Sequence, residues 1–193
     1  MKKGDYISTI LRLKKTVFSF KDIVLLWKDP GNAARVRVNY YVKRGSLYRI
    51  RQGFYAKDKN YDKFELATKI YTPSYISFET ILAKAGMIFQ LYDQIFVTSY
   101  LTREITADNQ KYSYKKIKDS VLTNNAGIEH KENYSIATFE RAFLDTVYLN
   151  KNYHFDNFSS INWDKIFKIL PIYDNKQMKK KVEKYYRNFK DNE

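Results

Sequence analysis

Residues 29–56 read DPGNAARVRVNYYVKRGSLYRIRQGFYA, and the periodicity of this stretch changes once, at Gly45. Before that glycine the apolar residues recur at helical spacing. This predicts a helix that has Asp29 as N-cap and Pro30 at its first position, and that runs to about Arg44. After Gly45 the period is two, which predicts a β-hairpin around a turn at residues 51–53, where a glycine can take a positive φ. The stretch therefore predicts one helix followed directly by a hairpin.

Two further helices are predicted upstream of this stretch. Residues 5–15 place their apolar side chains at near-helical spacing. Ser19 and Asp22 match a capping box, in which a hydroxyl and a carboxylate each bond an unpaired amide at the start of the next helix. Three helices followed by a hairpin is the order of a winged helix-turn-helix. We therefore expect such a DNA-binding domain over residues 1–58.

Basic charge is concentrated in the same segment. The chain has 193 residues and a formal net charge of +14. Residues 1–60 hold 15 Lys and Arg against four Asp and no Glu, a net charge of +11, whereas residues 61–193 hold 20 against 17 acids, a net charge of +3. This uneven distribution indicates a local surface that binds a polyanion. The alternative is the compositional bias of a low-GC genome, which raises Lys and Tyr content throughout a chain.

A helical projection of residues 32–44 separates two faces. One carries Ala34, Val38, Tyr41 and Val42 and is expected to pack on the preceding helices. The other suits a DNA major groove, because Arg can bond guanine and Asn can bond adenine bidentately, and Val can contact a thymine methyl. Residues flanking this face are expected to contact phosphate, and those of the hairpin to contact the backbone or minor groove. The predicted DNA-binding residues are Asn32, Arg35, Val36, Arg37, Asn39, Tyr40, Lys43, Arg44, Arg49, Arg51 and Gln52. The alternative is that this is simply a solvent-exposed helix face. However, a face that is only solvated does not require several basic residues in the near absence of acidic ones.

Residues 61–193 predict a mixed α+β domain that ends in helices, so the expected fold class of the chain is α+β. Helices are predicted over residues 62–71, 77–86, 138–150, 162–169 and 176–189, with Ser77 and Thr138 as two of the N-caps. A strand is predicted at residues 95–98, a hairpin around residues 107–109, and a short strand pair near residues 128 and 134–137. Because no low-complexity linker separates the two units, we expect them to pack together.

The sequence predicts no catalytic residue, cofactor site or metal site. Cysteine is absent, which excludes disulfides, thiolate zinc sites and thiol catalysis. His130 and His154 lack the spacing of metal ligands, and the six glycines form no phosphate-binding loop. Arg141 and Asp145 are four apart on a predicted helix and are expected to form an ordinary surface pair. No apolar run approaches the ~20 residues that cross a bilayer, so we expect a non-enzymatic cytoplasmic protein without a membrane partner.

Four blocks of sequence resemble a known family. They are the hairpin at residues 47–55, residues 73–82 with Gly86, Val97-Thr98 with Thr102-Arg103, and residues 137–145. In this order and spacing they resemble the AbiEi-type antitoxins, regulators of type IV abortive-infection toxin–antitoxin systems. The resemblance covers about residues 15–150. Thr80-Ile81 and Phe139 depart from the family's pattern at packing positions.

The resemblance implies a division of labour between the two units. In that family the amino-terminal winged helix binds and represses the operon's own promoter. The carboxy-terminal domain counteracts a separately encoded nucleotidyltransferase-like toxin, which in type IV systems does not require a stable complex. The implied partners are therefore double-stranded DNA and such a toxin. Two alternatives stay open: a stand-alone winged-helix regulator without a toxin, and an RNA-binding or nuclease-like protein that uses the same basic surface.

Overall fold

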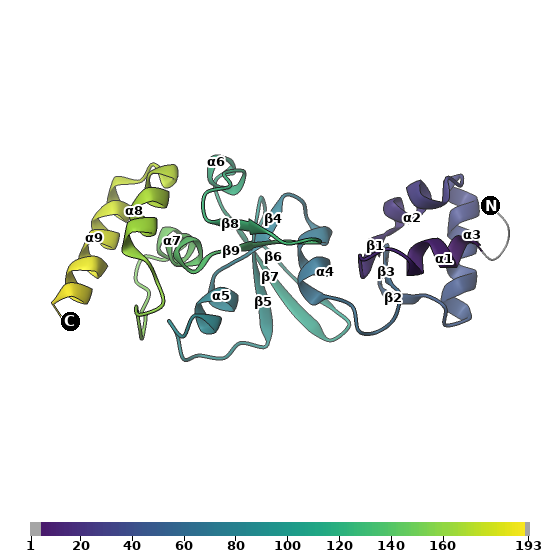
Figure 1. Cartoon of the computed structure of the whole chain (residues 1–193), viewed down its shortest axis with the longest axis horizontal. Coiled ribbons are helices and arrows are strands. Elements are labelled where there is room, and N and C mark those ends of the chain that lie inside the picture. Colours follow the sequence, from purple (N-terminus) through teal and green to yellow (C-terminus); the bar gives the residue numbers. More distant parts are fainter. Residues whose placement is uncertain (1–4, 192–193) are drawn as a thin grey trace.

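The chain is an α+β protein with two sheets, as the computed structural model of residues 5–191 shows (Figure 1). One sheet has three antiparallel strands and the other has six strands of mixed direction. The predicted α+β class is confirmed at this level. The molecule is elongated, with the amino-terminal helices at one end and the carboxy-terminal helices at the other.

The amino-terminal unit holds the first three helices and the smaller sheet. Its elements are α1 (Asp5–Leu11), β1 (Val17–Ser19), α2 (Phe20–Trp27), α3 (Gly31–Lys43), β2 (Tyr48–Arg51) and β3 (Phe54–Ala56). The hairpin formed by β2 and β3 was predicted, as was the positive φ of Gly53, which is 81°. Strand β1 was not predicted, because three residues are too few to display a period. It pairs with β3, and α1 ends before residue 15 because the chain must leave the helix to enter this strand.

The helix starts in this unit agree with one predicted cap and contradict another. The Ser19 hydroxyl accepts from the Asp22 N–H at 3.1 Å, and the Asp22 carboxylate accepts from the Ser19 N–H at 2.9 Å, which completes the predicted capping box of α2. The prediction of Asp29 as N-cap was wrong, because α3 begins at Gly31 with Pro30 in that position and no side-chain cap. Asp29 instead accepts a charge-assisted hydrogen bond from Arg37 Nε at 2.9 Å.

The core of the amino-terminal unit is built around Trp27. Its indole N–H donates to the main-chain oxygen of Tyr6 at 2.9 Å, and its ring contacts those of Tyr6 and Tyr41. Three of the α3 residues predicted to pack inward are buried, and the fourth, Val42, is partly buried against the same cluster. This packing fixes the orientation of α3 and leaves its opposite face to solvent.

The larger unit follows the predicted order of elements and adds three. Its elements are α4 (Lys63–Ile70), β4 (Ser74–Ile76), α5 (Glu79–Lys84), β5 (Gln94–Ser99), β6 (Arg103–Ala107), β7 (Gln110–Lys116), α6 (Asp119–Leu122), β8 (Ile128–His130), β9 (Ser135–Ala137), α7 (Phe139–Leu149), α8 (Trp163–Ile169), η1 (Leu170–Tyr173) and α9 (Lys176–Lys190). The strand order is β6-β7-β5-β4-β9-β8. The short elements β4, α6 and η1 were not predicted, because three or four residues carry no readable period.

Two predictions in this unit were wrong for the same reason. Arg141 and Asp145 do not form a surface pair: both side chains are 0% exposed, with Arg141 Nε 3.2 Å from Asp145 Oδ1. Ser77 does not cap α5, which begins after Phe78 without a side-chain cap. The Ser77 hydroxyl instead donates to Asp145 at 2.7 Å. A buried carboxylate must be hydrogen-bonded, and this one takes its donors from distant parts of the chain.

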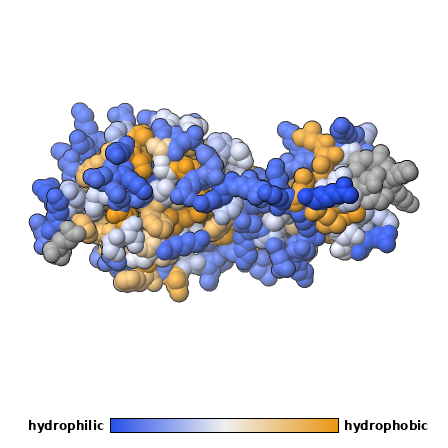
Figure 2. All heavy atoms as spheres, viewed as in Figure 1, coloured by the Kyte–Doolittle hydropathy of each residue, from blue (hydrophilic) through white to orange (hydrophobic). Residues whose placement is uncertain are grey.

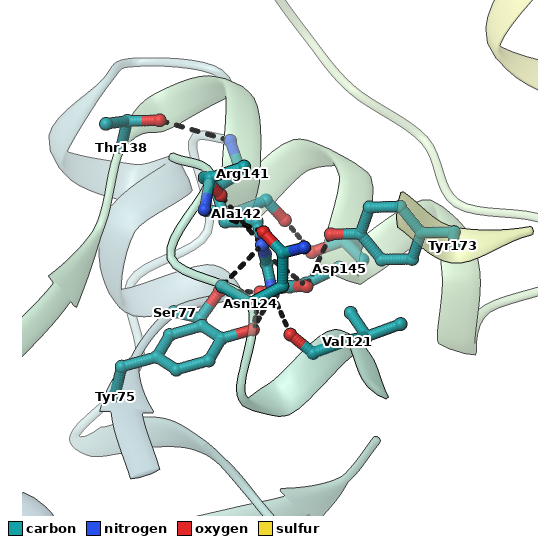
Figure 3. A network of polar contacts seen from close by, with 11 residues as sticks. Tyr75, Ser77, Val121, Asn124, Thr138, Arg141, Ala142, Asp145 and Tyr173 are labelled. Carbon is teal, nitrogen blue, oxygen red and sulfur yellow. Dashed lines mark hydrogen bonds and ion pairs between the residues drawn. The ribbon is translucent and has the colours of Figure 1, made fainter. Parts of the chain in front are cut away.

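The pair lies at the centre of a buried polar network (Figure 3). Besides Ser77, the hydroxyls of Tyr75 and Tyr173 donate to Asp145 at 3.0 and 2.6 Å. Burial and the adjacent Asp145 carboxylate raise the pKa of Tyr75 and of Tyr173 well above the ordinary tyrosine value, so both stay protonated as donors. The guanidinium of Arg141 donates to the main-chain oxygens of Val121 in α6 and of Ala126, which follows α6, at 2.7 Å each. The network therefore joins β4, α6, α7 and η1.

The two units are in direct contact. The main-chain N–H and the hydroxyl of Thr16 donate to Glu65 Oε2 on α4 at 2.8 and 2.7 Å, and Glu65 is only 1% exposed. The Tyr48 hydroxyl of β2 donates to Asp108 at 2.6 Å. Val17, Ile50 and Ala56 of the smaller sheet belong to the hydrophobic core of the larger unit. The face of the hairpin that is turned toward α4 is consequently buried. The opposite face of the hairpin lies beside α3.

Candidate nucleic-acid interface

A groove lies between α3 and the β2–β3 hairpin, where predicted DNA-binding residues of both elements meet. We name it the α3–hairpin groove. It is lined by Phe20, Arg35, Asn39, Arg49, Gln52, Gly53 and Tyr55. Four of these residues were predicted from the sequence, and the lining includes no Asp or Glu. The groove thus carries positive charge at the surface between a helix and a β-ribbon.

The side chains that line this groove are held in place by one another. Arg49 donates to Asn39 Oδ1 at 2.6 Å, which connects the hairpin to α3. The Arg49 guanidinium lies 5.8 Å from the centre of the Tyr55 ring, and that of Arg35 lies 5.8 Å from the centre of the Phe20 ring. Aromatic rings orient a guanidinium without neutralising it. Both arginines are therefore positioned while their charge remains open to an anionic ligand.

Other predicted residues are accessible on α3 but lie outside this groove. Val36 is 72% exposed and Tyr40 is 43% exposed, and both line a separate, more apolar hollow on the helix. Asn32, Lys43 and Arg44 are exposed as well. Arg44 donates to the Tyr40 hydroxyl at 2.5 Å. These residues extend the exposed surface of α3 beyond the groove.

Arg37 and Arg51 lie apart from the groove. Arg37 is occupied by its ion pair with Asp29 and by the Tyr6 ring, whose centre is 3.8 Å from the guanidinium carbon. Arg51 is half-buried, and its NH1 atom is buried without a hydrogen-bond partner among the described residues. The β2–β3 pairing shifts register between Arg49 and Arg51. In a regular strand, residues two apart point to the same face of the sheet. A bulge re-aims a side chain, so Arg49 and Arg51 point to different faces.

Sequence reasoning missed Phe20 and Tyr55, the two rings beneath the arginines. Tyr55 had a usable signal, because a hairpin that turns at residues 51–53 brings it opposite Arg49, and the structure shows this register. Phe20 had none, because it opens α2 and approaches Arg35 only when α2 packs on α3. The missing information was the position of one helix relative to another.

A second exposed feature was not predicted either. The segment between α5 and β5 presents Phe89, which is 74% exposed, and Leu91, which is 94% exposed. Hydrophilic residues cover most of the face in Figure 2, and hydrophobic side chains gather at its lower edge, over this segment. The segment is held in shape, since the Phe89 N–H donates to Asp156 at 2.8 Å. It is an apolar surface of the larger unit, distant from the α3–hairpin groove.

Histidine and carboxylate chemistry is sparse in the described part of the chain. Within residues 5–191, no three His, Asp or Glu side chains gather as metal ligands. His130 is exposed and hydrogen-bonded to Ser135 at 2.9 Å. Over the same residues, no helix is long and apolar enough to span a bilayer.

No protein-family model matches the chain, and no curated protein matches it. The AbiEi-type resemblance rests on its four sequence blocks alone.

Proposed function

We propose that the chain is a DNA-binding transcriptional regulator whose amino-terminal unit is a winged helix-turn-helix. In this proposal α3 is the recognition helix that enters the major groove and the β2–β3 hairpin is the wing. The observation that carries it is the α3–hairpin groove, in which Arg35, Asn39 and Arg49 meet without an acidic residue in the lining. Arg and Asn on an exposed helix are the side chains that read base edges in helix-turn-helix proteins.

Charge supports the same proposal. The net charge of +11 over residues 1–60 would attract a duplex, and the wing lies beside the recognition helix, where it could contact the adjacent backbone. Exposed Lys43 and Arg44 at the carboxy-terminal end of α3 would add phosphate contacts. Arg37 and Arg51 do not belong to this set, because Arg37 is paired with Asp29 and Arg51 is partly buried.

The salt dependence of binding tests the proposal. A mobility-shift titration of the full chain with a duplex of its own upstream region should show a log–log slope of about −4 to −5, because each of about five neutralised phosphates contributes roughly −0.9. The double variant Lys43→Ala/Arg44→Ala, which removes two of the proposed phosphate contacts, should bind more weakly and with a slope shallower by about two units, whereas Arg35→Ala/Arg49→Ala should bind more weakly with little change in slope. Arg187→Ala removes an exposed arginine from α9, at the other end of the molecule, and is the matched control. A slope near zero would contradict duplex binding.

The same experiment separates DNA binding from the RNA-binding and nuclease alternatives. DNA duplex should compete better than an RNA hairpin of equal length, because the deep, narrow major groove of A-form RNA does not admit a recognition helix. Binding should persist in a chelator and should leave the DNA intact. Stronger competition by RNA, or cleavage that depends on a divalent metal, would favour the alternative.

We further propose, on the AbiEi-type resemblance, that this regulator represses its own cytoplasmic operon and counteracts a nucleotidyltransferase-like toxin. The full chain and the Arg35→Ala/Arg49→Ala variant would each be co-expressed with the neighbouring gene. Both should rescue growth, while only the wild type should repress a promoter–reporter fusion. Truncation at residue 61 is a poor test, because Val17, Ile50 and Ala56 contribute to the core of the larger unit. Failure of both proteins to rescue growth would leave a stand-alone regulator.

A further inference from the structure

The hydrogen bond between Arg49 and Asn39 decides what Asn39 can offer to a base. A guanidinium carries donors only, so the carboxamide atom that faces it at 2.6 Å must be the carbonyl oxygen Oδ1. The amide nitrogen therefore lies on the other side of the carboxamide. Bidentate recognition of adenine needs both atoms, since Oδ1 accepts from the adenine N6–H and Nδ2 donates to N7. An adenine that bound Asn39 in this way would have to share Oδ1 with Arg49, and the remaining N–H groups of the guanidinium would then lie close to the adenine N6–H donor.

The remaining polar groups of the α3–hairpin groove are mostly donors. Arg35, Arg49 and the Asn39 amide nitrogen have N–H groups and no free acceptor. The main-chain oxygen of Gly53 is already bonded to the N–H of Phe20 at 2.8 Å. Two further lining side chains carry an acceptor, which are Gln52 in the hairpin turn and Tyr55, and Tyr55 is only 7% exposed and lies beneath Arg49.

A groove rich in donors matches one base edge better than the others. In the major groove guanine presents two acceptors, O6 and N7, whereas adenine presents N7 beside an N6–H donor that would face further donors. We propose that the α3–hairpin groove selects guanine over adenine, with Arg35 and Arg49 as the donors and the Arg49–Asn39 bond as the element that rejects adenine. This inference rests on the proposed DNA binding and specifies the base that the site reads.

The geometry of the groove also favours a defined contact. The rings of Phe20 and Tyr55 lie under Arg35 and Arg49, so less side-chain freedom is lost when a base binds. Asn39 fixes Arg49 from a second direction through its carbonyl. The arginines are therefore arranged for recognition before any ligand arrives.

Base analogues test the proposal on duplexes chosen by the protein itself. Duplexes would be selected from a random library with the full chain, and each guanine of the selected site would be replaced in turn. At one or more positions, 7-deazaguanine and adenine should weaken binding by about 5- to 150-fold, the range for a good bidentate contact. Inosine should bind as guanine does, because it keeps O6 and N7 and lacks only the minor-groove amino group.

One variant isolates the role of the Arg49–Asn39 bond. Arg49→Ala frees Asn39 Oδ1, so selection with this variant should admit adenine at the position where the wild type demands guanine. Arg187→Ala, the matched control on α9, should select the wild-type site. Steep salt dependence in the wild type combined with equal affinity for guanine, 7-deazaguanine and adenine would overturn the guanine proposal and leave DNA binding intact. The absence of any duplex binding would overturn both.

Discussion

Arginines in the two units of this protein have opposite surroundings. Arg141 is 0% exposed, and its guanidinium donates to Asp145, to the Tyr75 hydroxyl and to three main-chain oxygens, those of Val121, Asn124 and Ala126. Arg35 and Arg49 are exposed, lie over aromatic rings, and line a groove without an acid. A guanidinium whose five N–H groups are all taken stabilises the fold. One that is oriented but keeps donors free can bind a ligand.

The largest expected effect comes from disrupting the buried pair of Arg141 and Asp145. Asp145→Ala leaves Arg141 buried without its counter-charge and removes the acceptor of three hydroxyls. It should lower the free energy of unfolding by about 3–5 kcal/mol, measured by urea denaturation. The control is Lys131→Ala, which breaks the exposed pair with Glu129 and should leave the free energy of unfolding nearly unchanged. Equal losses in the two variants would show that the network contributes no more than a surface pair.

An intermediate effect is expected at Asp22, which is partly buried where the two units meet. Partial burial acts to raise the pKa of Asp22, but the hydrogen bond from the Ser19 N–H and the charge of Lys69 outweigh it, so the pKa lies below the ordinary aspartate value. A lowered pKa in the folded state adds stability above the unfolded value of about 3.9 and loses it as the pH falls through the folded value. Asp22→Asn should therefore cost about 0.5–1 kcal/mol at pH 7.

The measurement for Asp22 is the free energy of unfolding of both proteins from pH 7 to pH 3. The difference between wild type and Asp22→Asn should persist down to about pH 4 and then shrink. A difference that stays constant to pH 3 would mean that the ionised carboxylate does not contribute, and that only the shape of the side chain matters.

The smallest expected change in stability concerns the exposed arginines, which form the other half of the comparison. Arg35→Ala removes an exposed guanidinium that makes one distant ring contact, so the free energy of unfolding should change by no more than about 0.5 kcal/mol. Thermal unfolding would show this, while the same variant should lose affinity for duplex in the salt titration. A large loss of stability would instead make Arg35 a structural residue like Arg141.

Much of the fold could be predicted because its signals are local. The capping box of α2, the positive φ of Gly53 and the inward face of α3 each depend on residues within a single helix or a single hairpin. Within the candidate site, Arg35, Asn39, Arg49 and Gln52 were predicted for the same reason. The bulge that separates Arg49 from Arg51 was not, because no residue type marks it.

The sequence by itself determined the order of the main helices and the hairpin, and it placed the excess of positive charge in the first 60 residues. Only the tertiary structure decided which arginines face solvent, because burial and pairing depend on residues far apart in the chain. The spacing of Arg141 and Asp145 puts them on one side of a helix, but it contains no information about Tyr75 and Tyr173, which cover them. In the same way, Asn39 could be assigned to a base from its type, and only its contact with Arg49 showed which of its atoms faces the guanidinium.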